Sequence, residues 1–413
     1  MDYMDRKRRL AVRTLDVRSE RGVSRRTFLG GALFAAGCAV LAVANRILGR
    51  IPAARAQPED LTPQAYFPLA VKRYPQPKVV HVHASGATSW DFQTGWYGEC
   101  VEQGIVNQML ERGLVELTGV GSVDGAWGTL LPGYSPGKKI AIKVNLNNCG
   151  SCEDSDNVID ALIEPVNALI SSLVQAGIQA QDVWVYDASR RIPARFYNRR
   201  ENEQARHIDR FGCADETATF NHAHPSLKVS FSHPGMVTDR WLTDLLYHAS
   251  YLINMPILKR HSTIPVTLGF KNHFGSLDNL GGAGDDNPHP YVNPADNRYS
   301  ANFSPLVEIN ANANIAEKTV LTVGDALFGA SSVGATPAPW TTFGGSAPNS
   351  LLLSRDRVAI DCVMCDLLRA EWGLDQAAYD YLMLAEQWEL GTFEKGDPWA
   401  GGYDRLDYRY VEL

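Results

Sequence analysis

From residue 78 onward, short strand-like runs of apolar residues alternate with longer helix-like stretches. In residues 78–83 and 182–187, valine and aromatic side chains are frequent, which is typical of buried strands. In residues 98–112, apolar side chains recur every three or four positions, which indicates an amphipathic helix. The same criteria predict further strands over residues 139–146, 227–231, 251–255, 319–325 and 350–354, and further helices over residues 157–176, 238–249, 305–317 and 356–372.

The alternation of strands and helices predicts an α/β fold. Strands joined through helices pair in parallel, and the helices then cover both faces of the sheet. Two long polar segments, residues 188–221 and 276–303, are predicted to be insertions, and the second is long enough for a lid or a binding loop. Residues 404–413 are expected to add an edge strand. We therefore expect a mostly parallel sheet with helices on both faces and long loop insertions.

The N-terminus has the pattern of an export signal. The sequence SRRTFL at residues 24–29 places paired arginines ahead of the apolar run 30–44, as the twin-arginine translocation machinery requires. Cleavage after Ala56 is the favoured outcome, and it leaves Gln57 as the first residue. The alternatives are lipidation at Cys38 and an uncut apolar stretch that is retained as an anchor. Each alternative places the rest of the chain in the periplasm or otherwise outside the cytoplasm.

These features divide the chain into a signal peptide (1–56), a linker (57–77) and an α/β domain (78–413) of one body or two lobes. Residues 57–413 contain 27 basic and 42 acidic side chains, a net charge of −15. This charge argues against nucleic acid as a partner and restricts membrane contact to the export signal or a lipid anchor. A protein partner is not indicated by the sequence.

Two lysine-containing clusters follow the predicted strand 251–255. They are NMPILKRH at residues 254–261 and GFKNHFG at residues 269–275. Open α/β sheets present their ligand crevice just beyond the strand ends, so both clusters are candidates for its lining. The sequence has no nucleophile elbow, P-loop or Rossmann fingerprint, and it gives no support to a serine hydrolase, an NTPase or an ordinary dinucleotide enzyme.

The segments LINMPILKRH and TLGFKNHFGSL resemble the core signature of the domain of unknown function 362 family. Other segments are similar to this family in the same order, over roughly residues 78–370. The resemblance implies a shared fold and a shared site, but no known reaction. Many relatives carry a run of four cysteines for iron–sulfur clusters, and this chain lacks that run. The other matching positions are Lys143 and Asn145 after a strand, Asp325 at a strand end, and Asp356 and Asp361 in the segment SRDRVAID.

The lysines of these motifs predict a positive crevice in an otherwise acidic protein. Lys143, Lys259 and Lys271 would meet at the carboxyl ends of strands and bind a phosphate or a carboxylate. A metal-containing cofactor and redox chemistry are further hypotheses for the same crevice. The alternative is that the lysines pair with carboxylates and only hold loops together, the carboxylates being Asp187, Asp325 and Asp361.

Four more residues complete the predicted crevice. Asn145 and Asn272 would orient the anion by hydrogen bonds, and Asp325 would line the same hollow. His261 would transfer a proton if the protein is an enzyme. The contrasting hypothesis is a non-catalytic periplasmic binding or assembly protein, so the sequence leaves enzymatic activity open.

Two cysteine pairs have C-x-x-C spacing and allow three interpretations. The four thiolates of Cys149, Cys152, Cys362 and Cys365 would together bind zinc or an iron–sulfur cluster. Cys149 and Cys152 would alternatively form a disulfide or a redox pair. The third interpretation is inert packing, since the other pair lies in a predicted helix.

Five further histidines are expected to be structural. His81 and His83 share one face of a strand, where a hydrogen-bonded pair is commoner than a metal site. Surface-loop positions are the preferred interpretation for His222, His224 and His233. The glycine-rich segment 281–284 is predicted to be a loop and not a phosphate-binding turn.

Overall fold

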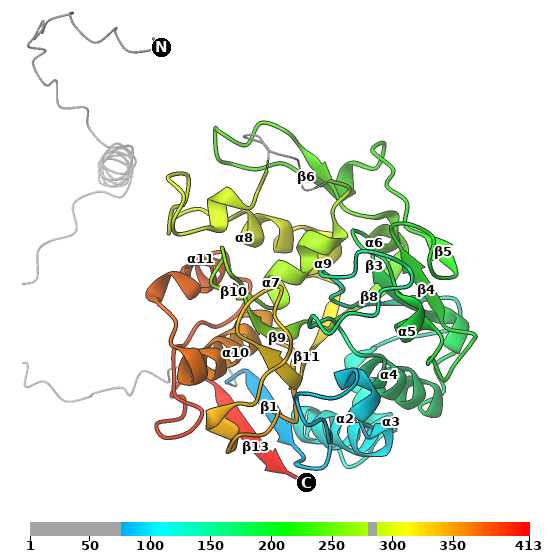
Figure 1. Ribbon diagram of the computed structural model, residues 1–413. Coiled ribbons are helices and arrows are strands. Elements are labelled where there is room, and N and C mark those ends of the chain that lie inside the picture. Colours follow the sequence, from blue (N-terminus) through cyan, green and yellow to red (C-terminus); the bar gives the residue numbers. More distant parts are fainter. Residues whose placement is uncertain (1–75, 280–286) are drawn as a thin grey trace, which may run out of the picture. The chain divides into compact units, whose positions relative to one another are not determined.

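The computed structural model describes residues 76–279 and 287–413. Its main sheet is large, mixed and mostly parallel, which confirms the predicted α/β class (Figure 1). The strands are β1 (Lys78–His83), β2 (Lys139–Lys143), β3 (Val183–Asp187), β4 (Arg206–Asp209), β5 (Glu216–Thr217), β6 (Lys228–Val229), β7 (Arg240–Trp241), β8 (Ala249–Asn254), β9 (Ile257–Arg260), β10 (Val266–Thr267), β11 (Thr319–Ala330), β12 (Ser350–Ser354) and β13 (Asp407–Glu412).

The order of strands across the main sheet is β13-β1-β12-β11-β8-β2-β3-β4-β5, with β9 beside β11 and β10 beside β9. Neighbours from β11 to β5 run parallel, whereas β12 is antiparallel to both β1 and β11. The C-terminal strand β13 pairs in parallel with β1 at the edge of the sheet, as expected for residues 404–413. Residues 228–229 and 240–241 form a separate two-stranded sheet.

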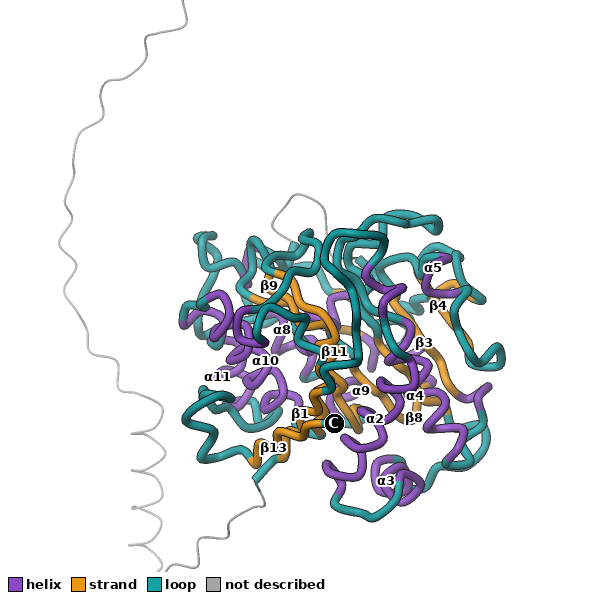
Figure 2. The backbone as a smooth tube through the Cα atoms, turned by 60° about the horizontal axis from the view of Figure 1, so that its bottom comes forward, coloured by secondary structure: helices purple, strands orange, loops and turns teal. Residues whose placement is uncertain are grey.

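The described α-helices pack around this sheet, and Figure 2 shows them on its two sides. They are α2 (Gln103–Thr118), α3 (Val123–Leu130), α4 (Ile163–Gln175), α5 (Ala194–Tyr197), α6 (Asp244–His248), α7 (Gly269–Asn272), α8 (Pro305–Asn310), α9 (Ala313–Ala316), α10 (Arg357–Trp372) and α11 (Asp380–Gln387).

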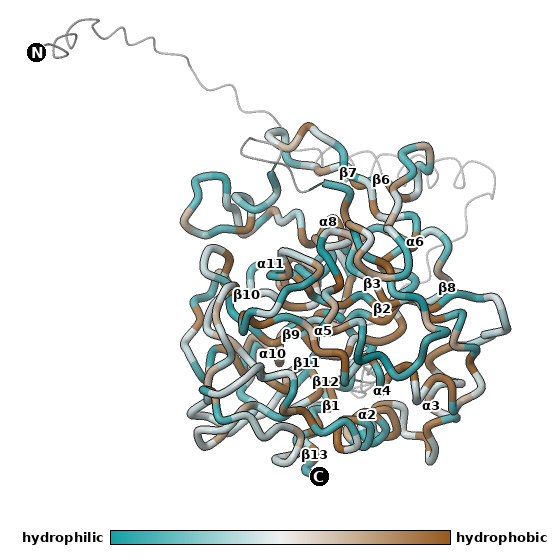
Figure 3. Tube along the Cα trace, turned by 45° about the vertical axis from the view of Figure 1, so that its right-hand side comes forward, coloured by the Kyte–Doolittle hydropathy of each residue, from teal (hydrophilic) through white to brown (hydrophobic). Residues whose placement is uncertain are grey.

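The sheet has an apolar core on each face, because successive side chains of a strand point to opposite sides. Ile140 and Ile142 of β2 join the core under α2, α3 and α4, whereas Ala141 joins the core under α10 and α11. Figure 3 shows apolar residues along the central strands and polar residues in many of the outer loops. A sheet buried on both faces is the usual result of parallel pairing through helices.

Some predicted element bounds were wrong, for identifiable reasons. The predicted helix 157–176 begins only at Ile163, because Pro165 is tolerated in the first turn but not in a helix interior. The predicted helix 305–317 divides into α8 and α9, since the side chain of Asn312 accepts the Asn314 N–H and caps a new helix that starts at Ala313. The predicted helix 238–249 is reduced to the short α6.

The site lies where the winding of the sheet reverses. From β2 the chain adds β3, β4 and β5 on one side, and it later places β8 and β11 on the other side of β2. The carboxyl ends of β2, β3 and β8 therefore surround a crevice at the point of reversal. Such crevices are the usual ligand sites of open α/β sheets.

Three sequence features fall partly or wholly outside the described residues: the motif at 24–29 with its cleavage site, most of the linker 57–77, and the glycine-rich segment 281–284. Within residues 76–279 and 287–413, no helix combines the length and the apolar run that crossing a bilayer demands.

Candidate functional site

The strand ends at the point of reversal carry polar side chains. Lys143 ends β2, Asp187 ends β3 and Asn254 ends β8, and Lys143 is in register with Asn254. All three side chains are buried. Parallel strands thus bring a cation, a carboxylate and an amide from distant parts of the sequence to one edge.

Lys143 is fully engaged inside the protein. Its Nζ lies 3.1 Å from Oδ2 of Asp187 and donates to Oδ1 of Asn272 at 3.2 Å and to the Val144 carbonyl at 2.5 Å. Burial lowers the pKa of Lys143, while Asp187 acts to raise it. The pairing with Asp187 that the alternative interpretation predicted is therefore present for this lysine.

Asn272 ties the short helix α7 to the strand ends. Its Nδ2 donates to the Lys143 carbonyl at 3.1 Å and to Oδ1 of Asn254 at 2.8 Å. Nδ2 of Asn254 in turn donates to the Gly269 carbonyl at 2.9 Å. All the polar atoms of the Asn272 side chain therefore have protein partners, and its role here is to position α7.

Asp361 of α10 holds the other end of α7. Its carboxylate accepts the backbone N–H groups of Gly269 at 2.8 Å and Phe270 at 3.0 Å, and the hydroxyl of Tyr381 at 3.1 Å. A side chain at Gly269 would have its Cβ only 2.7 Å from this carboxylate, so the contact requires glycine. The SRDRVAID segment thus holds the N-terminal end of α7 through Asp361.

The backbone position of Lys271 in α7 is held firmly, because the residues before and after it are hydrogen-bonded to Asp361 and to the strand ends. Its side chain is 7% exposed, and its Nζ lies 4.6 Å from the ring centre of Phe274. Within the described ranges, no carboxylate lies within 4 Å of this Nζ. Burial, together with the charges of Lys259 and Arg190, lowers the pKa of Lys271 to about 7.

Lys259 approaches from the other face of the sheet. Its Nζ is buried and donates to the Ile159 carbonyl at 3.4 Å, and Asp160 is its neighbouring acid. Burial lowers the pKa of Lys259, and Asp160 opposes this effect. Lys259 therefore adds positive potential to Lys271 but does not line the crevice itself.

The crevice contains a pocket lined mainly by polar side chains, which we call the polar cavity. Four of the predicted residues line it together, and they come from β2, from the segment after β2 and from α7. Its lining consists of Lys143, Asn145, Asn147, Asp187, Ser189, Thr267, Lys271, Asn272, Phe274, Gly275 and His289.

His261 lies beside the site but does not line the polar cavity. Its Nδ1 accepts the backbone N–H groups of Thr263 and Ile264, each at 3.2 Å. Burial and the neighbouring cations lower its pKa to about 3, so the ring is neutral near pH 7. The proton-transfer role of this histidine stays a prediction.

Sequence reasoning missed two contributors. His289 lines the polar cavity, and burial with the charge of Lys271 lowers its pKa to about 3. Arg190 lies at its edge, donates to the Asn147 carbonyl at 2.8 Å and adds to the positive potential at Lys271. Both lie in long loops without periodicity. The available signals were the run Pro-His-Pro and an arginine pair beside the end of β3.

Asp325 does not belong to the crevice. It is buried on the side of β11 that carries Val323 and Leu327, and it accepts backbone N–H groups from Leu162 and Leu327. Burial raises its pKa to about 7. The prediction that it lines the cavity with the lysines was wrong, because the side chain points to the α4 face.

A comparison with protein-family models matches residues 140–366 to the domain of unknown function DUF362. This chain belongs to the DUF362 family. The matched part of this DUF362 protein begins in β2 and ends in α10, so it includes Lys143, Lys271 and Asp361. No curated protein matches the chain in a sequence search.

The four cysteines considered as metal ligands do not meet in the DUF362 domain. Cys152 forms a disulfide with Cys213, which replaces the predicted pairing with Cys149. Cys149 belongs to the core on one face of the sheet, whereas Cys362 and Cys365 belong to the core on the other. Within the described ranges, no three His, Cys, Asp or Glu side chains are grouped closely enough to hold a metal ion.

The five histidines expected to be structural have partners in the structure. His81 hydrogen-bonds Tyr408 and Ser350, each at 2.8 Å, and Nδ1 of His83 lies 3.0 Å from the Pro348 carbonyl, which confirms the satisfied strand pair. The other three lie in loops against aromatic rings: His222 on Trp241, His224 on Tyr247, and His233 on Tyr291 and Phe303.

Proposed function

We propose that this DUF362 domain binds a small oxyanion, a phosphate or a carboxylate, in the polar cavity beside Lys271. One observation carries the proposal: an almost completely buried lysine borders the cavity, and among residues 76–279 and 287–413 no carboxylate forms an ion pair with it. A buried ammonium group without a counter-ion is costly, and proteins retain such groups chiefly at functional sites. An anion from solution would supply the missing charge.

Two further groups of the cavity suit an anion. The hydroxyl of Thr267 is buried and has no hydrogen-bond partner among the described residues. Asn145 also lines the cavity, and its Oδ1 accepts the Asn147 N–H at 3.3 Å, which directs its amide donors elsewhere. Ammonium, hydroxyl and amide donors together match oxyanions better than they match a metal ion.

The same geometry assigns different roles to the predicted residues. Lys271 contacts the anion, with Asn145 and Thr267 as donors. Lys143 and Asn272 position α7 through their internal hydrogen bonds. Lys259 and Arg190 increase the positive potential at Lys271.

A binding protein and an enzyme would use this cavity differently. In an enzyme, Lys271 is the group suited to proton transfer, because a pKa of about 7 lets it both hold and release a proton near neutral pH. In a pure binding protein, the ammonium only neutralises the ligand. Turnover that disappears in Lys271→Arg, with anion binding retained, would distinguish the enzyme from the binding protein.

We further propose that the protein is exported through the twin-arginine signal. The disulfide between Cys152 and Cys213 supports this proposal, because such bonds persist in oxidising compartments outside the cytoplasm. Immunodetection in periplasmic fractions, with Arg25→Lys and Arg26→Lys exchanged together, tests it. Periplasmic protein that is undiminished in the double variant would contradict the proposal.

The binding proposal is tested by titration calorimetry with inorganic phosphate and with acetate. Lys271→Met keeps the length of the side chain but removes its charge, and we expect it to abolish the binding. Lys138→Met is the matched control, because it removes one exposed positive charge at the protein surface. Absence of binding of both anions to the wild type, or equal binding by Lys271→Met, would contradict the proposal.

A further inference from the structure

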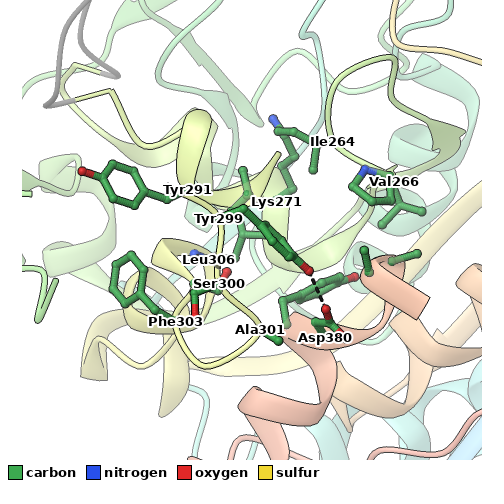
Figure 4. Close-up of a pocket in the computed structure, with 16 residues that line it drawn as sticks. Ile264, Val266, Lys271, Tyr291, Tyr299, Ser300, Ala301, Phe303, Leu306 and Asp380 are labelled. Atoms are coloured by element: carbon green, nitrogen blue, oxygen red, sulfur yellow. Dashed lines mark hydrogen bonds between the residues drawn. The ribbon is translucent and has the colours of Figure 1, made fainter. Parts of the chain in front are cut away.

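A second cavity shares Lys271 with the polar cavity, and we call it the aromatic cavity (Figure 4). Its lining is mostly apolar and comes from β10, the segment before α8, and α11. The side chains that shape it include Ile264, Val266, Tyr291, Tyr299, Phe303 and Leu306.

Lys271 borders both cavities. The short strand β10 lies between them, with Val266 on the aromatic side and Thr267 on the polar side. The segment that begins at residue 287 is divided in the same way, since His289 lines the polar cavity and Tyr291 lines the aromatic cavity. A single ligand that touches Lys271 therefore has apolar walls available on one side and hydrogen-bond donors on the other.

The aromatic cavity presents ring surfaces more than polar atoms. The rings of Tyr291 and Phe303 meet edge to face, with centroids 5.8 Å apart. The hydroxyl of Tyr299 is committed to Asp380, 2.5 Å away, as the dashed line in Figure 4 shows. Edge-to-face walls of this kind favour a flat aromatic guest.

The aromatic cavity is also mechanically connected to the anion site. Tyr381 lines it, and the Tyr381 hydroxyl donates to Asp361. Asp361 in turn accepts the N–H groups of Gly269 and Phe270 at the start of α7, two residues before Lys271. The walls that would hold an apolar group and the lysine that would hold an anion are therefore parts of one hydrogen-bonded unit.

We propose that the ligand is an aryl oxyanion: its phosphate or carboxylate lies against Lys271 in the polar cavity, and its aromatic ring lies in the aromatic cavity. This inference rests on the proposed function and adds the chemical class of the ligand. It follows from the position of Lys271, which has no ion-pair partner among the described residues, between donors on one side and aromatic rings on the other.

The test compares inorganic phosphate with phenyl phosphate by titration calorimetry on the purified full chain. Burial of a phenyl ring is worth about a 10- to 100-fold gain in affinity, so phenyl phosphate is expected to bind more tightly by that factor. Equal affinities of the two probes would overturn this inference and leave the anion site intact. Failure of inorganic phosphate and acetate to bind would instead overturn the proposed function itself.

A substitution at the aromatic cavity tests whether the aromatic ring of the ligand binds there. Ala301 is exposed and lines the aromatic cavity, so Ala301→Trp adds a large ring there without replacing a buried side chain or a residue of the polar cavity. We expect it to leave the affinity for inorganic phosphate unchanged and to remove the advantage of phenyl phosphate, whereas Ala301→Ser should behave as the wild type. An advantage that survives in Ala301→Trp would place the ring elsewhere and overturn the inference.

Discussion

Lys143 and Asp187 end neighbouring parallel strands and form an ion pair inside the protein, with 3.1 Å between Nζ and Oδ2. The Asp187 carboxylate also accepts the backbone N–H groups of Leu146, Ser189 and Arg190. One carboxylate thus fixes the start of two loops that border the polar cavity. The Lys143–Asp187 pair supports the structure of the site, whereas Lys271 is the charged residue that we propose contacts the anion.

Asp187→Asn is expected to destabilise the fold by about 3–5 kcal/mol, because it leaves the buried ammonium of Lys143 without its partner. Urea unfolding measures the effect. Glu386→Gln is the control, since its ion pair with Arg405 is exposed and should contribute less than about 1 kcal/mol. Similar free energies of unfolding for the two variants would contradict the assigned role.

Gly275→Ala is expected to damage both stability and anion binding. The added Cβ would lie 2.7 Å from Nζ of Lys143 and 3.1 Å from Oδ1 of Asp187, so the ion pair must shift. Gly128→Ala offers a matched change on an exposed helix, with no atom within 4 Å, and should stabilise by about 0.5–1 kcal/mol. A Gly275→Ala protein with unchanged stability and phosphate affinity would disprove the close packing.

Lys271→Met should stabilise the protein while it abolishes anion binding. The folded-state pKa of Lys271 is about 7, below its ordinary value, so the charged amine opposes folding. The gain, up to about 4–5 kcal/mol, is full below pH 7 and shrinks as the pH rises toward the ordinary pKa of lysine. Denaturant unfolding at several pH values measures it, with Lys138→Met as the neutral control. A destabilised Lys271→Met would contradict the account.

The sequence predicted the fold class, and it predicted that Lys143 and Lys271 lie together, because both follow from local pattern. Strand alternation identified β1, β3 and β12, and the motifs after β8 marked the residues that α7 carries. The sequence did not determine which face of one strand lies on the same side of the sheet as a given face of another strand. Asp325 shares its face with Val323, on the α4 side, whereas Lys143 shares its face with Ala141, on the opposite side.

The other missed residues depend on long-range contacts. Arg190 and His289 reach the site from irregular loops, and no period in the sequence marks such positions. The partner of Cys152 was missed for the same reason, because Cys213 lies 61 residues away while Cys149 lies at the familiar spacing. Local spacing favoured the wrong pair.

Peptide mapping under non-reducing conditions should recover a linked pair that contains Cys152 and Cys213. Cys213→Ser should lower the free energy of unfolding by about 2–5 kcal/mol, because the bond closes a loop of 61 residues. Cys100→Ser is the control, since this cysteine is unpaired and only half-buried. A peptide that links Cys149 to Cys152 would restore the original prediction.

The most direct test of the central claim is the pKa of the Lys271 side chain, measured by NMR of labelled lysine with and without inorganic phosphate. We predict a pKa of about 7 in the free protein and a clear rise when phosphate binds, because the anion stabilises the charged amine. A pKa near the ordinary value for lysine that does not respond to phosphate or acetate would contradict the claim.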